Sequence, residues 1–152
     1  MAADQTVRLR QTGETPASAD GTRMRALTYD ILADGRRVGV CELRPDPTWA
    51  ARLSGQVSYT VFPPCRGHHY ALRALRLLCA EARAMGADSL IVTCRPDNAA
   101  SRRTLDLAGA ALEGTETVPP EHPLARSGIR QVCVYKINLT RHFRPRDRNE
   151  HG

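Results

Sequence analysis

A basic turn at residues 66–69 carries the clearest chemistry in this 152-residue sequence. The turn follows residues 56–62, whose alternating pattern predicts a strand, and it opens a helix that ends at Gly86. The first amides of a helix have no partner within the helix and lie at the positive end of its dipole. Gly67 allows a ligand to approach the backbone closely, and Arg66 adds a full positive charge. This combination predicts an anion site, most naturally for phosphate, with an ordinary water-solvated turn as the alternative.

The cysteines and histidines do not follow a metal-binding pattern. The five cysteines show no C-x-x-C spacing and lie mostly inside strand or helix patterns, which favours reduced and buried thiols. The adjacent His68 and His69 would point in different directions on a helix, and no third ligand accompanies them. Cys65 lies beside Arg66 just before the helix, where a thiolate is stabilised, so a catalytic role and a plain turn residue both stay open.

Hydrophobic periodicity predicts the elements that position this turn. The helix after the turn carries an apolar stripe formed by Ala71, Leu75, Leu78, Ala82 and Met85. A second helix is predicted at residues 98–107, with Asp97 as its N-cap. Strands are predicted at residues 7–10, 23–32, 37–43, 88–94, 112–118 and 129–139, with a hairpin turn at Asp34-Gly35.

This order of elements predicts an α+β fold, with a central mixed β-sheet flanked by helices. We expect a single domain over residues 1–152, with its core at residues 6–139 and a disordered polar tail at residues 140–152. The crossover through the central helix predicts that the strands before and after it run parallel.

Composition and charge narrow the class of protein. The chain is 41% hydrophobic with a net charge of +6, which suits an anionic cofactor or a nucleic acid. Nucleic-acid binding is the less favoured of the two, because no binding motif or aromatic interleaving accompanies the arginines. No apolar run approaches the roughly 20 residues of a membrane span, and the N-terminus lacks a signal-peptide pattern. The sequence therefore predicts a cytoplasmic protein that does not bind a membrane.

The segment VFPPCRGHHYALRAL resembles motif A of the GNAT superfamily of N-acetyltransferases, which is written Q/R-x-x-G-x-G/A. Arg66 matches its first position and Ala71 its last, while His69 stands where the family usually has glycine. Downstream, the DNAAS run at residues 97–101 and the AGA run at residues 108–110 are similar to a second family segment, in the expected order. The resemblance covers about residues 37–139 and implies the GNAT fold with reduced N-terminal helices.

The resemblance implies acetyl-CoA as the acetyl donor. The pyrophosphate would bind at the helix start, on Arg66, Gly67, His68, His69, Tyr70 and Ala71. The pantetheine arm would lie along Tyr59, Thr60, Val61 and Phe62 and would meet Asn98. Arg102 or Arg103 could reach the adenosine phosphates, because arginine suits bidentate phosphate contact; a solvated helix face is the alternative for either one.

The resemblance also implies direct transfer of the acetyl group to an amine, for which an acid and a base are needed. Leu105 occupies the position where many members carry the tyrosine acid. Ser101 instead resembles the serine of the ribosomal-protein acetyltransferase-like branch, which can hydrogen-bond the cofactor sulfur; a capping role is the alternative. Glu121 and His122 are the candidate bases, ahead of Glu42 and Tyr135, and a bound water could also serve.

The acceptor is predicted to be a small-molecule or peptide amine, because the superfold supports both. Only about a dozen turn-forming residues stand where the family usually places helices between its first two strands. The acceptor wall could come from the loop at residues 45–53, from the loop at residues 119–128 or from a second subunit, so a homodimer is one expectation. A CoA-binding module without activity and a basic nucleic-acid-binding domain are the alternatives to the enzyme.

Overall fold

The structure, a computed structural model, describes residues 6–48 and 50–142. Four antiparallel strands form the first sheet in the order β1-β2-β3-β4. They are β1 (Val7–Thr15), β2 (Ala26–Ala33), β3 (Arg36–Leu43) and β4 (Val57–Val61). The β2–β3 hairpin turns at Asp34 and Gly35, whose φ angles of 50° and 82° fit the positive values of a type I′ turn. No helix lies between β1 and β2 in the part of the chain that the structure describes, which confirms the reduced N-terminal helices.

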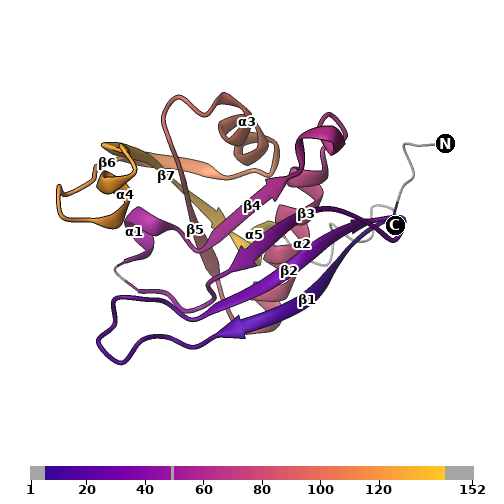
Figure 1. Cartoon of the computed structure of the whole chain (residues 1–152), viewed down its shortest axis with the longest axis horizontal. Coiled ribbons are helices and arrows are strands. Elements are labelled where there is room, and N and C mark those ends of the chain that lie inside the picture. Colours follow the sequence, from indigo (N-terminus) through magenta and orange to yellow (C-terminus); the bar gives the residue numbers. More distant parts are fainter. Residues whose placement is uncertain (1–5, 49, 143–152) are drawn as a thin grey trace.

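A second antiparallel sheet has the order β5-β7-β6. Its strands are β5 (Ser89–Cys94), β6 (Ala111–Thr117) and β7 (Gln131–Asn138). Figure 1 shows β1 to β4 side by side, with the strands of the second sheet beyond β4. The α+β class is confirmed, but the single mixed sheet is not observed, because β4 and β5 do not pair as a ladder.

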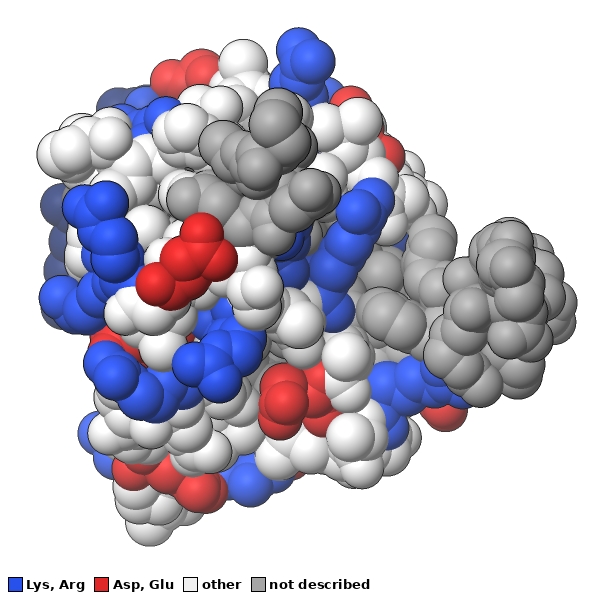
Figure 2. Space-filling model, turned by 90° about the vertical axis from the view of Figure 1, so that its right-hand side faces the viewer, with Lys and Arg blue, Asp and Glu red and all other residues white. Residues whose placement is uncertain are grey.

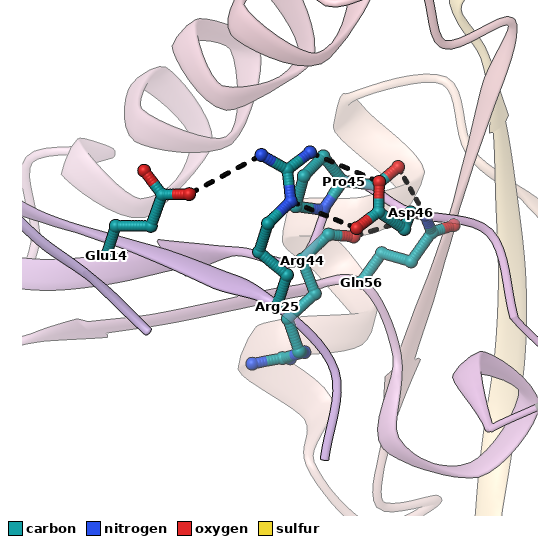
Figure 3. A network of polar contacts seen from close by, with 6 residues as sticks. All are labelled: Glu14, Arg25, Arg44, Pro45, Asp46 and Gln56. Atoms are coloured by element: carbon teal, nitrogen blue, oxygen red, sulfur yellow. Dashed lines mark hydrogen bonds and ion pairs between the residues drawn. The ribbon is translucent and has the colours of Figure 1, made fainter. Parts of the chain in front are cut away.

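Gln56 joins the two sheets at the base of β4, and beyond it the two strands do not pair. The backbone N–H of Gln56 donates to the carbonyl of Ile91 (2.7 Å), and its side-chain Oε1 accepts from the N–H of Ile91 (2.9 Å). Its Nε2 donates to the carbonyls of Arg44 (3.2 Å) and Pro45 (3.4 Å). The side chain is buried, and Figure 3 shows it against Arg44 and Pro45. One amide therefore serves three backbone groups where the sheets meet.

Two hydrophobic clusters hold the helices against the sheets. The helices are α1 (Ala51–Ser54), the 3-10 turn η2 (Pro63–Cys65), α2 (Tyr70–Ala84), α3 (Ala99–Leu107), α4 (Pro123–Arg126) and α5 (Leu139–His142). The main core cluster packs α2 against both sheets and includes Leu75 of α2, Leu105 of α3 and Tyr135 of β7. A smaller cluster around Val132 and Val134 packs against Leu124 of α4 and Leu53 of α1 on the opposite face of the second sheet.

The buried face of α2 differs from the predicted stripe. Its buried residues are Tyr70, Ala74, Leu75, Leu78, Cys79 and Ala82. Ala71 is half-buried and Met85 is 46% exposed, because α2 ends before Met85 and its buried arc includes Ala74 and Cys79. Gly86 follows with φ of 97°, as expected of a residue that ends a helix.

Two helix ends differ from the sequence prediction. Asn98, rather than Asp97, caps α3, because its Oδ1 accepts from the N–H of Ser101 while Asp97 pairs with Arg95. The sequence predicts a disordered tail from residue 140, but residues 140–142 belong to α5; residues 143–152 lie outside the described residues. No helix in the described part of the chain is long and apolar enough to cross a membrane.

Candidate active site

A cleft of about 270 Å³ opens where β4 and β5 separate beyond Gln56. Residues of β4 and β5 form its sides, and Asn98 and Ser101 at the start of α3 line it as well. Leu124 and Val132, which pack on the opposite face of the second sheet, also line the cleft. The cleft therefore extends between the two sheets from the α3 side to the α4 side, so two molecules could meet inside it from opposite sides.

None of the strands that the structure describes pairs with the edge of β4 that faces the cleft. Phe62 donates its N–H to Val38 of β3, and the β3–β4 register pairs Val61 with Gly39 and Tyr59 with Cys41. Because antiparallel strands alternate in the direction of their backbone bonds, the main-chain groups of Tyr59 and Val61 point away from β3. Of the four residues predicted to meet the pantetheine arm, Tyr59 and Val61 can offer backbone N–H groups to a ligand, whereas Thr60 and Phe62 use theirs toward β3.

The predicted phosphate-binding turn lies at the far end of β4. Arg66 donates from Nε to the carbonyl of Val61 (3.1 Å), which holds its guanidinium against the end of the strand. Gly67 has φ of 96°, and a Cβ at this position would meet nothing within 4 Å. The backbone at Gly67 is thus open to a ligand, as the sequence predicts for an anion site.

The structure places the start of α2 later than the sequence suggests. The helix begins at Tyr70, and His69 is its N-cap in the left-handed region (φ 60°, ψ 26°) with no side-chain cap bond. His68 packs its ring near that of Tyr70, with 5.3 Å between the centroids. The amides that open the helix are therefore those of Tyr70, Ala71 and the residues after them, and the turn before them is exposed. Figure 2 shows the molecule from the side that lies at the right of Figure 1, where basic and acidic side chains are interspersed over the visible face.

Tyr59 and Ser101 come together across the cleft. The Tyr59 hydroxyl on β4 lies 3.2 Å from the Ser101 Oγ in the first turn of α3, so the two form a hydrogen bond. Burial raises the pKa of Tyr59 above its ordinary value, which keeps the phenol protonated. Burial likewise raises the pKa of the Cys94 thiol, and Ser101 also lies against Cys94. Two neutral hydroxyl groups thus share the inner part of the cleft.

The family of the chain follows from a model that matches most of its length. The model described as "Acetyltransferase (GNAT) domain" matches residues 2–111. The chain belongs to the GNAT acetyltransferase family. Members of this family use acetyl-CoA, and the N-terminal amides of α2, the open backbone at Gly67 and the unpaired edge of β4 fit its phosphates and its pantetheine amides.

Solved structures have the same fold. The microcin C7 self-immunity acetyltransferase MccE, solved with acetyl-CoA and AMP, matches with a TM-score of 0.58 at 21% identity over 74% of this chain and 61% of MccE. The ribosomal L7/L12 acetyltransferase RimL matches with a TM-score of 0.58 at 20% identity, over 75% of this chain and 70% of RimL. RimJ of Mycobacterium smegmatis, solved with a CoA disulfide, matches with a TM-score of 0.60 at 23% identity, over 74% of this chain and 53% of RimJ. The chain thus spans about three fifths of the length of MccE. No curated protein matches the sequence.

Leu105 cannot supply the acid that many GNAT proteins carry at its position. Its side chain is fully buried in the main core and has no ionisable group. Arg102, in contrast, turns inward from α3 and donates from Nε to the Tyr135 hydroxyl (3.0 Å). Arg103 is exposed on the same helix, so its predicted contact with the adenosine phosphates stays a prediction.

The two predicted bases of this GNAT protein lie on the loop before α4. Glu121 is exposed, and His122 caps α4 by accepting the N–H of Leu124 at its Nδ1 (3.1 Å). A neutral histidine that accepts at Nδ1 carries its proton on Nε2, which can then donate but not accept. Neither residue lines the cleft, and their catalytic roles stay predictions. Tyr135 is buried under Arg102, and Glu42 pairs with Arg44 on the outer face.

A larger hollow of about 630 Å³ lies on the outer face of the first sheet and adjoins the cleft at Ser58 and Tyr59. Asp30, which lines this hollow, is already paired with Arg10 and Arg37. The smaller cleft is the better candidate active site, because it combines the unpaired edge of β4 with the Tyr59–Ser101 pair. Within the residues described, no three His, Cys, Asp or Glu side chains gather as metal ligands would.

The Tyr59–Ser101 contact is the feature that the sequence did not predict. The sequence places Tyr59 on a strand and Ser101 on a helix, 42 positions apart in the chain. The alternation of residues 56–62 indicates that Tyr59 shares a face with Val57 and Val61, but it cannot indicate which helix residue that face meets.

Proposed function

We propose that this GNAT protein transfers the acetyl group of acetyl-CoA to a primary amine and that Ser101 stabilises the departing thiolate. The observation that carries the proposal is the position of Ser101, which lies inside the cleft at the start of α3 and is hydrogen-bonded to Tyr59. A serine at a solvated helix surface would serve the backbone alone, whereas this hydroxyl points at a strand with an unpaired edge.

The binding of the donor is assigned to two surfaces. Arg66, Gly67, His68, His69, Tyr70 and Ala71 hold the pyrophosphate, through the amides that open α2 and the charge of Arg66. The backbone N–H groups of Tyr59 and Val61 pair with the pantetheine arm, as those of a neighbouring strand would. Asn98 uses its Oδ1 to cap α3, so its contact with the arm comes from its Nδ2. Acetyl-CoA supplies the activated acetyl group at the inner end of this path.

The protein's own groups then meet the charges that the transfer creates. The N–H groups on the unpaired edge of β4 that the pantetheine arm does not use are the available donors to the carbonyl oxygen, which gains negative charge as the amine attacks. The Ser101 hydroxyl donates to the sulfur as the carbon–sulfur bond breaks. The proton of the amine passes to a base. A water in the cleft is the nearest candidate, and Glu121 and His122 would act only through water, because neither lines the cleft.

The acceptor enters from the α1 and α4 side of the cleft, opposite α3. This entrance is lined by Leu53, Leu124 and Ile129, so an aliphatic wall surrounds the incoming amine. An aliphatic wall favours an uncharged amine, because burial disfavours the ammonium form. Both a small-molecule amine and a peptide amine fit this description, and a homodimer that completes the wall stays a prediction.

Release of CoA and acetylation of the acceptor, measured together on a panel of primary amines and peptides, test the proposal. We expect a product heavier by one acetyl group and a rate that falls about tenfold in Ser101→Ala, since hydrogen bonds to charged groups contribute about 1.5–3 kcal/mol. Ser127→Ala, an exposed serine after α4, is the matched control and should keep the wild-type rate. Binding of acetyl-CoA without transfer to any amine would favour the CoA-binding module instead.

A further inference from the structure

We propose that Tyr59 is a positioning residue that directs the proton of the Ser101 hydroxyl toward the thiolate of CoA. The inference rests on the proposed function, because it requires that the thiolate forms beside Ser101. The residues that meet the leaving thiolate would then include Tyr59 of β4 as well as Ser101 of α3.

The geometry places the two hydroxyl groups on opposite walls of one cleft. Tyr59 projects from β4, Ser101 projects from the first turn of α3, and their oxygens lie 3.2 Å apart. Both residues line the cleft, and Asn98 fixes the turn that carries Ser101 by capping its N–H at 3.1 Å. The pair is therefore held by two separate elements rather than by one flexible loop.

The chemistry of the pair decides which oxygen donates. A serine hydroxyl has one proton and can accept two further hydrogen bonds, and a neutral phenol also has one proton to give. If Tyr59 donates to Ser101 Oγ, the Ser101 proton is free to point into the cleft. If Ser101 donated to Tyr59 instead, the Ser101 proton would be turned away from the sulfur and only the phenol proton would be free, so a thiolate that forms beside Ser101 selects the first arrangement.

The other groups near Ser101 are poorer donors to a thiolate. Cys94 of β5 lies against Ser101, but a thiol is a weak donor. Arg102 of α3 is directed to Tyr135 of β7, and Asp106 of α3 is exposed. Cys133 of β7 is buried. Leu105, at the family's usual acid position, has no proton to offer. Arg95 also lines the cleft but is paired with Asp97, so the Tyr59–Ser101 chain is left as the donor.

The reaction balances without any proton leaving the pair. When the carbon–sulfur bond breaks, its electron pair passes to the sulfur, and the Ser101 proton hydrogen-bonds to the resulting thiolate. The Tyr59 proton hydrogen-bonds to Ser101 Oγ at the same time, and both protons stay on their oxygens. The amine nitrogen releases one proton to the solvent, and the thiolate takes up one proton from the solvent as CoA leaves, so the protons balance.

Calorimetric titration with CoA and with desulfo-CoA, which lacks the sulfur, isolates the contact without any turnover. At pH 9 much of the CoA thiol is ionised, because its pKa is close to the roughly 8.5 of an ordinary thiol. We expect wild-type protein to bind CoA about tenfold more tightly than desulfo-CoA at pH 9 and to show a smaller preference at pH 6.5. Tyr59→Phe should reduce the preference at pH 9 about three- to fivefold and leave the affinity for desulfo-CoA unchanged.

Three comparisons separate the positioning role from a general structural one. Tyr29→Phe removes a buried phenol from β2, away from Ser101, and should keep the wild-type preference. Adding Tyr59→Phe to Ser101→Ala should cause no further loss, since the phenol acts through the serine. Replacing Tyr59 by 3-fluorotyrosine keeps the shape and makes the neutral phenol a stronger donor. Compared with wild type at about pH 8, where the more acidic phenol stays protonated in its buried site, it should raise the preference for CoA about twofold. In turnover, Tyr59→Phe should lower kcat and leave KM for acetyl-CoA unchanged.

The outcomes distinguish the inference from the proposed function. If Ser101→Ala loses the preference for CoA while Tyr59→Phe keeps it, Ser101 acts alone and the inference is overturned. If wild-type protein binds neither CoA nor desulfo-CoA, the proposed function fails first and the inference fails with it. A fluorotyrosine variant with the wild-type preference would also contradict the inference, and this variant does not depend on Tyr59→Phe folding correctly.

Discussion

At the scale of single residues, His69 is the position where this chain departs from its family most directly. His69 has φ of 60° just before α2, where the family usually has glycine. A residue with a Cβ is strained in this region by about 1–2 kcal/mol, whereas glycine is not. His69 therefore adopts the left-handed backbone conformation that glycine favours, although its Cβ makes this conformation strained.

His69→Gly should consequently stabilise the protein or leave its stability unchanged, although glycine usually destabilises a folded chain. We expect a gain of up to about 1 kcal/mol in the free energy of unfolding, because relief of the left-handed strain exceeds the added freedom of the unfolded chain. His68→Gly is the matched control, since its φ is not positive, and it should lower the stability. Urea unfolding of both variants checks this, and equal losses in the two would contradict it.

At the scale of elements, Asp30 ties three strands of the first sheet together. It lies on β2 with little exposure and binds Arg10 of β1 (2.8 Å) and Arg37 of β3 (2.8 Å). The hydrogen bonds from Arg10 and Arg37 hold the pKa of the Asp30 carboxyl below its ordinary value. A carboxylate with a lowered pKa stabilises the folded state above its unfolded pKa of about 3.9, and this contribution is lost as the pH falls through the folded value.

Asp30→Asn should therefore unfold at lower urea than wild type at pH 7, and the gap should narrow as the solution is acidified below about pH 4. The amide keeps the shape of the side chain but removes the charge that the two guanidinium groups face. Asp88→Asn, an exposed change before β5, serves as the control. A gap that stays constant from about pH 7 to about pH 3 would show that the ionised carboxylate is not the source of the effect.

At the scale of the whole molecule, Gln56 sets where the two sheets meet and hence where the cleft begins. Gln56→Ala would leave the N–H of Ile91 and the carbonyls of Arg44 and Pro45 without their side-chain partner. We expect a loss of about 2–4 kcal/mol in the free energy of unfolding, because buried groups left without a hydrogen bond cost about 1–3 kcal/mol each. Gln11→Ala on the exposed face of β1 should change stability by less than about 0.5 kcal/mol. Equal effects at the two positions, measured by urea unfolding, would contradict this role.

The sequence predicts the strands and helices well where their patterns are local. The alternation in residues 56–62, the hairpin at Asp34-Gly35 and the glycine after the central helix each depend on neighbouring residues alone. The place where the two sheets meet could not be predicted, because Gln56 bonds a residue of β5 that lies 35 positions away in the chain. The buried face of α2 is predicted only in part for a similar reason, since two sheets rather than one define it.

One part of the candidate site can be predicted from neighbouring residues, and another part cannot. The turn from Arg66 to Ala71 is contiguous, so its residue types are enough by themselves to indicate an anion site. The hydrogen bond between Tyr59 and Ser101 depends on how β4 and α3 face each other across the cleft, and the residues next to either one in the sequence do not determine that arrangement.

Residue-resolved amide hydrogen exchange with and without acetyl-CoA tests most directly whether the donor lies along the unpaired edge of β4. We predict that acetyl-CoA slows exchange at Tyr59, Val61 and the residues that open α2, while Ser58 and Thr60, whose backbone already bonds to β3, change little. Arg66→Glu should weaken binding at least about tenfold and remove this protection, whereas Arg8→Glu, the same charge change at an exposed position of β1, should keep it. Protection of the outer sheet face instead, or no change at Tyr59 and Val61 at saturating acetyl-CoA, would contradict the account.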